Sequence, residues 1–164
     1  MNIETEKKYL IKMPSEEILS GLEQSEIEQI YIVTSGNYDG ERVRRRRYPE
    51  REVFTRTGKR RLTAMSAIED EREISSEEFY SLSRNIEQGT VPVIKKRYVM
   101  PYRGYDFEID VYPFWSETAV MEVELPSETA EFELPPEITV ICDVTDDMRY
   151  KNHAIARKRP PEMR

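Results

Sequence analysis

Polar and apolar side chains alternate with a period of two in eight segments of the chain. This period is typical of β-strands whose two faces have different surroundings. In the clearest segment, Glu122 and Glu124 fall on one face, and Met121 and Val123 fall on the other. The predicted strands span residues 2–12, 27–34, 41–48, 52–59, 68–74, 93–100, 106–112 and 118–125.

Helix signals are fewer and shorter than strand signals. Ser15 is a suitable cap for a short helix, and Ser75 forms a capping box with Glu78 at the start of a second one. Gly89 is expected to end this second helix, and residues 146–157 form a third. Loops are expected at 60–67 and 127–136, and a short strand or turn at 138–142. The fold class is therefore α+β, mainly antiparallel β.

Composition narrows the functional classes. The 164 residues predict a single domain over 1–158 with a flexible tail at 159–164. Charged residues make up 35% of the chain, so charges lining an interior would fit its composition. The net charge of −7 argues against a general nucleic-acid binder, although the stretch 42–48 is strongly basic.

The chain has one cysteine and one histidine. Cys142 excludes an internal disulfide and indicates a reducing compartment. With His153 alone, a histidine-based metal cluster or catalytic triad is not available. The sequence shows no signal peptide and no apolar run that could span a membrane, so we expect a cytoplasmic protein.

Charges on the polar strand faces sort by strand. Acidic residues gather on the first, fifth, seventh and eighth predicted strands, and basic residues on the third, fourth and sixth. The charged face lies either in solvent or inside a closed barrel, and sequence spacing alone does not choose between these orientations. If the face is buried, a row such as Arg42, Arg44 and Arg46 needs anions. Arginine grips phosphate with two donors, and carboxylates suit Mg²⁺ or Mn²⁺.

An ordered series of short motifs resembles the triphosphate tunnel metalloenzymes, also called the CYTH superfamily, and most closely their bacterial inorganic triphosphatases. The series opens with the Glu-x-Glu-x-Lys signature and extends over roughly residues 3–154. It comprises Glu4-x-Glu6-x-Lys8, Gln29-x-Tyr31, Arg42-x-Arg44, Thr57-x-Lys59, Glu69-x-Glu71-x-Glu73, Lys95-x-Arg97, Asp110, Glu122-x-Glu124 and Tyr150-x-Asn152. The resemblance implies an eight-stranded antiparallel β-barrel that forms a tunnel, with about three outer helices.

The same resemblance implies roles for individual residues. The metal ligands, for Mg²⁺ or Mn²⁺, would be Glu4, Glu6, Glu71, Asp110, Glu122 and Glu124, with Glu69 and Glu73 as alternatives to Glu71. The phosphate-binding residues would be Lys8, Arg42, Arg44, Lys59, Lys95 and Arg97. Lys8 and Tyr31 would contribute to catalysis. Two departures from the family pattern are that Arg60 or Arg61 must supply an arginine usually found before the acidic strand, and that Arg44/Arg46 can replace Arg42/Arg44.

By this resemblance, the expected activity is metal-dependent hydrolysis of the terminal phosphoanhydride of a triphosphate, with inorganic tripolyphosphate as first choice. Thiamine triphosphate, nucleoside triphosphates and cyclisation of ATP are alternatives within the family. A non-catalytic polyphosphate-binding module is the alternative from another class, and a nucleic-acid binder built on 42–47 is a third. The expected partners are small-molecule triphosphates or polyphosphates, with no nucleic acid and no membrane, and the chain is expected to be a monomer or homodimer.

Overall fold

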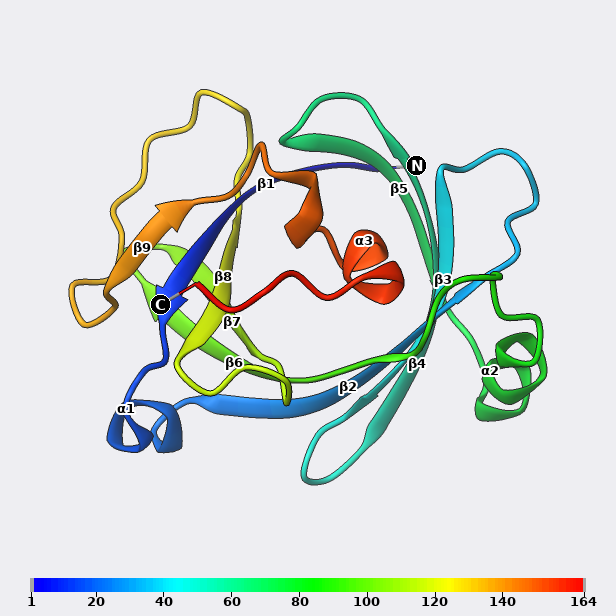
Figure 1. Ribbon diagram of the computed structural model, residues 1–164, viewed down its shortest axis with the longest axis horizontal. Coiled ribbons are helices and arrows are strands. Elements are labelled where there is room, and N and C mark those ends of the chain that lie inside the picture. Colours follow the sequence, from blue (N-terminus) through cyan, green and yellow to red (C-terminus); the bar gives the residue numbers. More distant parts are fainter. Residues whose placement is uncertain (1, 164) are drawn as a thin grey trace.

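The fold is a closed antiparallel β-barrel with a helix in its interior (Figure 1). This computed structural model describes residues 2–163. The strands are β1 (Asn2–Lys12), β2 (Glu23–Ile32), β3 (Gly40–Arg47), β4 (Glu52–Arg61), β5 (Ser66–Glu73), β6 (Val93–Tyr102), β7 (Tyr105–Val111), β8 (Thr118–Glu124) and β9 (Val140–Asp143). The helices are α1 (Glu16–Ser20), α2 (Ser76–Ser83) and α3 (Asn152–Arg157), and a 3₁₀ turn, η1 (Met148–Tyr150), precedes α3. The prediction of eight antiparallel strands in a closed barrel is confirmed, and β9 is an additional ninth strand.

The ring of strands closes at β1. The sheet order is β5-β4-β3-β2-β6-β7-β8-β1-β9, and a further pairing between β5 and β1 closes the ring. One edge of β1 pairs with β8 over residues 6–12. Its other edge pairs with β5 over residues 2–5 and with β9 over residues 9–11. The strand that carries the Glu-x-Glu-x-Lys signature is therefore hydrogen-bonded along most of its length on both sides.

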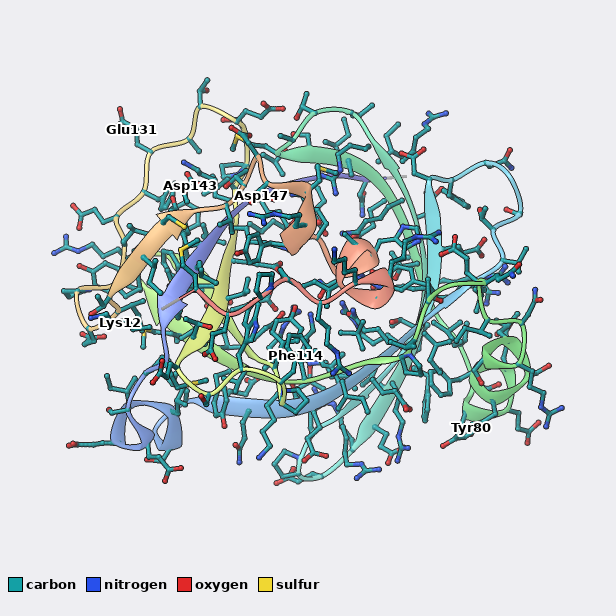
Figure 2. All side chains as sticks on the ribbon, in the orientation of Figure 1. Lys12, Tyr80, Phe114, Glu131, Asp143 and Asp147 are labelled. Carbon is teal, nitrogen blue, oxygen red and sulfur yellow. The ribbon has the colours of Figure 1, made fainter. Side chains whose placement is uncertain are left out.

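Two apolar clusters lie on the outer face of the barrel. Under α2, Phe79 packs against Ile32 and Val43 of β2 and β3. On the opposite wall, β1 and β6–β8 pack against the segment 125–139, which contributes Leu125 and Ile138. Because these coverings bury the apolar face, the charged face of the strands turns inward. Side chains fill the space inside the ring as well as its outside (Figure 2).

The third helix lies inside the ring of strands, whereas α1 and α2 lie outside it (Figure 1). This corrects the expectation of three outer helices. Tyr150 and Ile155 pack against inward-facing Leu10, Tyr112 and Val120 to form a third apolar cluster. Apolar residues at one end of the barrel interior therefore bind the C-terminal segment as a plug.

Several element boundaries differ from the sequence-based predictions. Helix α2 ends at Ser83 rather than at Gly89, which adopts a φ of +86° further along the connection. The predicted helix 146–157 is divided, because Lys151 has extended backbone angles between η1 and α3. The loop expected at 60–67 is shorter, because β4 continues to Arg61 and β5 starts at Ser66.

Residues that follow Lys158 are attached to the barrel in the described part of the chain. The Trp115 indole Nε1 donates to the Pro160 carbonyl at 3.2 Å. A Glu162 carboxylate oxygen accepts from the backbone nitrogens of Glu117 and Thr118 at 2.6 and 3.0 Å. These contacts attach Pro160 and Glu162, within the flexible tail expected at 159–164, to the barrel, and Arg164 lies outside the described residues. Among residues 2–163, no helix combines the length and apolar character needed to cross a membrane.

Candidate active site

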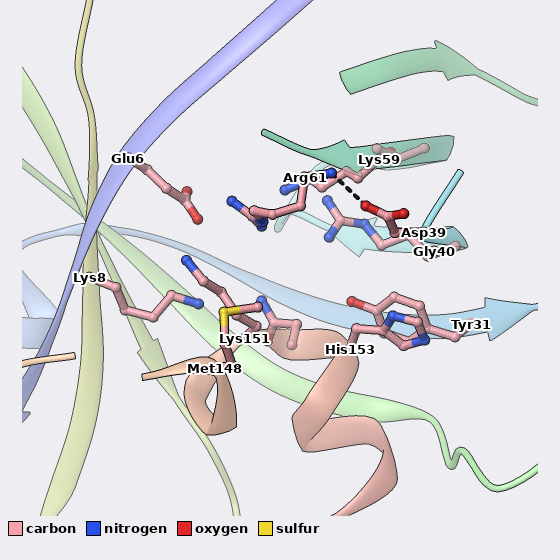
Figure 3. Close-up of a pocket in the computed structure, with 13 residues that line it drawn as sticks. Glu6, Lys8, Tyr31, Asp39, Gly40, Lys59, Arg61, Met148, Lys151 and His153 are labelled. Atoms are coloured by element: carbon pink, nitrogen blue, oxygen red, sulfur yellow. Dashed lines mark hydrogen bonds between the residues drawn. The ribbon is translucent and has the colours of Figure 1, made fainter. Parts of the chain in front are cut away.

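A cavity of about 240 Å³ lies between the strands around β1 and the plug (Figure 3). Inward-facing side chains from β1 to β4 form its walls, and residues of η1 and α3 close one side. Its lining comprises Glu6, Lys8, Tyr31, Asp39, Gly40, Arg42, Thr57, Lys59, Arg61, Met148, Lys151, Asn152 and His153. The period-two alternation of β1 places Glu4, Glu6 and Lys8 on this inner face.

Two carboxylate pairs lie on the inner face near the cavity. Glu6 and Glu122 are neighbouring carboxylates on this inner face. Burial and the neighbouring charge of Glu122 raise the pKa of Glu6 to about 8. Lys8 is almost completely buried beside this pair, with its Nζ 3.2 Å from Glu122 Oε1 and 3.0 Å from the Tyr150 carbonyl oxygen.

The second pair is Glu4 and Glu69. Burial and the hydrogen bond to Glu4 raise the pKa of Glu69 to about 7. Burial opposes ionisation of Glu4, but the charge of Lys59 and the hydrogen bonds lower its pKa to about 2. The Lys59 Nζ lies 2.9 Å from Glu4 and 3.4 Å from Glu69. In each pair one carboxyl has a raised pKa, so its proton would compete with a bound cation.

Arginines of β3 face these carboxylates from across the barrel. Among residues 2–163, no carboxylate forms an ion pair with Arg42 or Arg44. Arg42 is buried and its Nε has no hydrogen-bond partner, and Arg44 bonds only to the Gln29 side-chain oxygen, at 2.7 and 3.1 Å. Burial, together with the charges of Arg42 and Arg97, lowers the pKa of Arg44 to about 9. Cations that lie inside the barrel without a carboxylate in ion-pair contact favour an anionic ligand.

Asp110 is placed differently from the other predicted metal ligands. It is completely buried, and its carboxylate accepts hydrogen bonds from Lys95 Nζ at 2.6 Å and from Arg97 Nε and a terminal nitrogen at 2.8 and 2.9 Å. Burial opposes ionisation, but these two cations lower the pKa of Asp110 to about 2. Asp110 is therefore an ion-pair partner of two predicted phosphate-binding residues, and its role as a metal ligand stays a prediction.

The remaining acidic residues of the motif series are more exposed. Glu71 accepts a hydrogen bond from Thr57 Oγ1 at 2.9 Å and is exposed, as is Glu73. Glu124 lies opposite Glu6 in the β1–β8 register and is also exposed. Burial and the charges of Glu4 and Glu108 raise the pKa of Glu124 above its usual value. The structure thus brings Glu4, Glu6, Glu69 and Glu122 inside and leaves the other three at a mouth of the barrel.

Tyr31 lies at the opposite end of the cavity from Lys8 (Figure 3). Its ring stacks on His153 with centroids 4.5 Å apart, and the His153 Nε2 lies 2.7 Å from Glu87. Asn152 accepts hydrogen bonds from Tyr112 Oη at 2.7 Å and from Lys95 Nζ at 3.4 Å. Asn152 therefore connects α3 both to Tyr112 of the apolar cluster and to Lys95 of the cationic wall.

The cavity lining can be compared with the alternatives for the basic strand and for the missing arginine, and the roles of these residues stay predictions. Arg42 lines the cavity, whereas Arg46 donates to Ser25 Oγ at 2.9 Å, outside the lining. Of the two alternatives for the missing arginine, Arg61 lines the cavity and Arg60 does not. The backbone nitrogen of Arg61 also donates to the carboxylate of Asp39 at 2.6 Å.

Sequence reasoning missed Lys151, Asp39 and Met148 as lining residues. They come from a connection and from the divided third helix, where no period identifies the inward side. For Lys151, the available signal was its position inside the Tyr150-x-Asn152 motif.

Carboxylate oxygens are the ligands that hard divalent cations prefer, so the donor set of the two carboxylate pairs fits Mg²⁺ or Mn²⁺. Within the described part of the chain, no group of three or more acidic, cysteine or histidine residues is arranged as a complete metal cluster. The residues that would hold a cation are therefore present as pairs.

A closed barrel with an ionised inner face is the architecture of a tunnel protein, and comparisons with solved structures identify the family. The inorganic triphosphatase NE1496 has 30% sequence identity to this chain and a TM-score of 0.58, over 98% of this chain and 99% of that chain. The PH1819 protein of Pyrococcus horikoshii OT3 has a TM-score of 0.55 with 16% identity, over 76% of this chain and 80% of that chain, and shows the fold alone. No family model and no curated protein matches the chain.

The likeness to NE1496 extends over nearly all of both chains. This chain belongs to the triphosphate tunnel metalloenzyme (CYTH) family.

Proposed function

We propose that this protein is a triphosphatase that hydrolyses the terminal phosphoanhydride of inorganic tripolyphosphate, giving pyrophosphate and phosphate, with a divalent cation. One observation carries the proposal: buried Arg42 and half-buried Arg44, which form no ion pair with a carboxylate of the described residues, face two carboxylate pairs across the barrel. Such an interior is complementary to a polyanion that arrives with a cation. The inorganic triphosphatase activity named for NE1496 supports the same reaction class.

The chain's cationic residues would bind and orient the substrate. Arg42 and Arg61 line the cavity and would grip phosphate oxygens, each with two donors. Lys8, held between Glu122 and the Tyr150 carbonyl, would place its ammonium beside the transferring phosphoryl group. Because the Lys8 ammonium is held before substrate binds, it would stabilise the developing charge with little reorganisation.

Glu4, Glu6 and Glu122 are the residues that would hold the cation, and Glu6, whose pKa is raised to about 8, would lose its proton when the cation binds. When bound, a divalent cation would neutralise phosphate charge and lower the pKa of a bound water. The apolar plug formed by Tyr150 and Ile155 would exclude bulk water from one side of the site.

Cavity size favours an inorganic substrate over a nucleotide. The volume of about 240 Å³ lies below the roughly 300–1,000 Å³ of pockets that enclose drug-sized ligands. Most of the side chains that line the cavity are charged. The rings of Tyr31 and His153, which also line it, are already stacked on each other. A base or thiazole ring would have to displace this pair or stay outside.

Phosphate release from tripolyphosphate with Mg²⁺ or Mn²⁺ tests the proposal, with the Glu4→Ala/Glu6→Ala double variant as the comparison. Wild-type turnover that is lost in the variant supports the triphosphatase. Glu28→Ala is a matched control, because Glu28 points away from the cavity on β2. Thiamine triphosphate and ATP, assayed for phosphate and for cyclic product, test the family alternatives. Tripolyphosphate binding without turnover would instead indicate a non-catalytic polyphosphate-binding module.

A further inference from the structure

Lys151 lies where the C-terminal segment is fixed most firmly to the barrel interior. Its neighbour Tyr150 accepts a hydrogen bond from Lys8 Nζ at 3.0 Å through its backbone carbonyl. Its other neighbour, Asn152, accepts from Tyr112 Oη at 2.7 Å through its side chain. The extended backbone of Lys151, with φ −70° and ψ 140°, directs its side chain into the cavity between these anchors (Figure 3).

The ammonium of Lys151 is buried with few partners. The residue is 7% exposed, and its Nζ donates to the Ala64 carbonyl at 3.0 Å. An ammonium has three donors, so this bond leaves two to point into the cavity. No carboxylate in the described part of the chain forms an ion pair with it.

The charged groups that face Lys151 have both signs. Lys8 of β1 and Arg61 of β4 repel its charge, and Glu6 of β1 and Glu122 of β8 attract it. Burial, followed by the charges of Lys8 and Arg61, lowers the pKa of Lys151 to about 8. In the ligand-free cavity, the charge of Lys151 is therefore incompletely compensated.

We propose that Lys151 binds a phosphate oxygen of the substrate directly, so that the C-terminal plug supplies part of the phosphate clamp. The proposal rests on the proposed triphosphatase function. A phosphate group in the cavity would accept the two free donors of Lys151 and offset the repulsion from Lys8 and Arg61. A cation at this place would be repelled by three positive groups, so the ligand at Lys151 is the anion.

Coupling between substrate and plug follows from this contact. If phosphate binds Lys151 only when the segment 148–157 is docked, substrate must stabilise the docked segment by the same factor by which docking strengthens binding. Tripolyphosphate should therefore slow backbone amide exchange in 148–157, and this slowing should be smaller when Lys151 loses its charge.

The test compares Lys151→Met, Lys151→Arg and Lys158→Met with the wild-type protein. Methionine keeps an unbranched side chain without the charge, and arginine keeps the charge. Lys158 is exposed directly after α3 and serves as the matched control. The measurements are the KM and kcat for tripolyphosphate hydrolysis, tripolyphosphate affinity by calorimetry without divalent cation, and the melting temperature without ligand.

We expect Lys151→Met to weaken calorimetric binding and raise the KM by roughly ten- to a hundred-fold, as for loss of one charge-assisted hydrogen bond. Lys151→Arg should recover most of this loss, and Lys158→Met should match the wild type. Unchanged binding by Lys151→Met would overturn the proposal, as would an equal loss in Lys151→Arg. If the wild type releases no phosphate, the triphosphatase function fails, while calorimetry still decides the role of Lys151.

Discussion

Replacing Asp110 by asparagine removes one negative charge from the most deeply buried ion-pair network and keeps the side-chain shape. Lys95 and Asp110 have fully buried side chains, and that of Arg97 is 6% exposed. Three hydrogen bonds of 2.6–2.9 Å join these residues. The variant leaves two buried cations close to a third, Arg44, which also lacks a carboxylate partner among residues 2–163.

The expected loss follows from the cost of unpaired buried charge. Breaking a buried ion pair costs roughly 3–5 kcal/mol. For a protein of this size, 1 kcal/mol corresponds to roughly 2–4 °C in melting temperature, so Asp110→Asn should melt about 6–20 °C below the wild type. Glu108→Gln is the control: Glu108 pairs with Arg97 at 3.0 Å, but its side chain is 32% exposed, so its loss should cost at most about 1 kcal/mol.

The pH dependence of the unfolding free energy gives an independent check of the role of the Asp110 ion pairs. The pKa of Asp110 is lowered from its usual value of 3.8 to about 2, so the folded state binds fewer protons than the unfolded state in this range. Its stabilisation is present above about pH 4 and is lost as the pH falls through about 2. The difference between wild type and Asp110→Asn should therefore shrink below about pH 4.

Urea unfolding at pH 7 and at pH 3, together with Mg²⁺ titration followed by melting temperature, measures these effects. If Asp110→Asn lost less than about 1 kcal/mol of unfolding free energy at pH 7, the ion-pair reasoning would be refuted. If stability stayed near that of the wild type while the Mg²⁺-induced shift disappeared, Asp110 would be a metal ligand, as the family resemblance implies.

Three further results are expected. A Cβ at Gly58 would lie 2.6 Å from the ring of Tyr38, so Gly58→Ala should lower the unfolding free energy by roughly 1–3 kcal/mol in urea titration, and a neutral result would contradict this packing. Because Lys151 binds phosphate in its charged form and has a pKa lowered to about 8 by burial and by Lys8 and Arg61, kcat/KM for tripolyphosphate should fall as the pH rises through about 8. Lys151→Arg should remove this part of the fall, and identical profiles would exclude Lys151 as its source. Mg²⁺ should raise the melting temperature of the wild type but not that of Glu6→Gln, in which a neutral amide replaces the carboxyl beside Glu122; an equal rise would remove Glu6 from the metal site.

Period-two alternation was sufficient to find the strands, because it records the difference between their two faces. It did not reveal which face is inside, since a covered apolar face and a core-facing apolar face have the same pattern. Orientation depends on what packs against Val43 and Val123, and those partners, α2 and the segment 125–139, are distant in sequence. The motif resemblance supplied the orientation that spacing left open.

The ion-pair network around Asp110 depends on the register that the turn between β6 and β7 imposes. Arg97 lies opposite Asp110 because β6 and β7 are joined at Arg103 and Gly104, which both have positive φ. A tight turn centred between these two residues fixes the register, since paired positions must then be equidistant from it. The motif series groups Asp110 with the carboxylates, because spacing along the sequence does not reveal which residue of β6 lies opposite it.

The plug could not be predicted from local pattern. Helix α3 has six residues, too few for an apolar stripe to define a face, and it mixes Asn152 and His153 with Ile155 and Ala156. Its position inside the barrel depends on long-range contacts, including the hydrogen bond from Lys8 to the Tyr150 carbonyl. Residues such as Lys151 become part of the site only through this docking.

The charges inside the barrel affect both the stability of the empty protein and its affinity for ligand. Without ligand, the pKa of Glu6 is raised by burial and by the charge of Glu122, and Arg42 and Arg44 form no ion pair with a carboxylate of the described residues, so the interior retains an unfavourable electrostatic free energy. A triphosphate with its cation would replace the proton of Glu6 and pair the arginines in one event. The free energy of that relief would appear as binding affinity. An inner face of charges in place of an apolar core thus lowers the stability of the empty barrel and raises its affinity for the one kind of ligand that can neutralise both sets of charges.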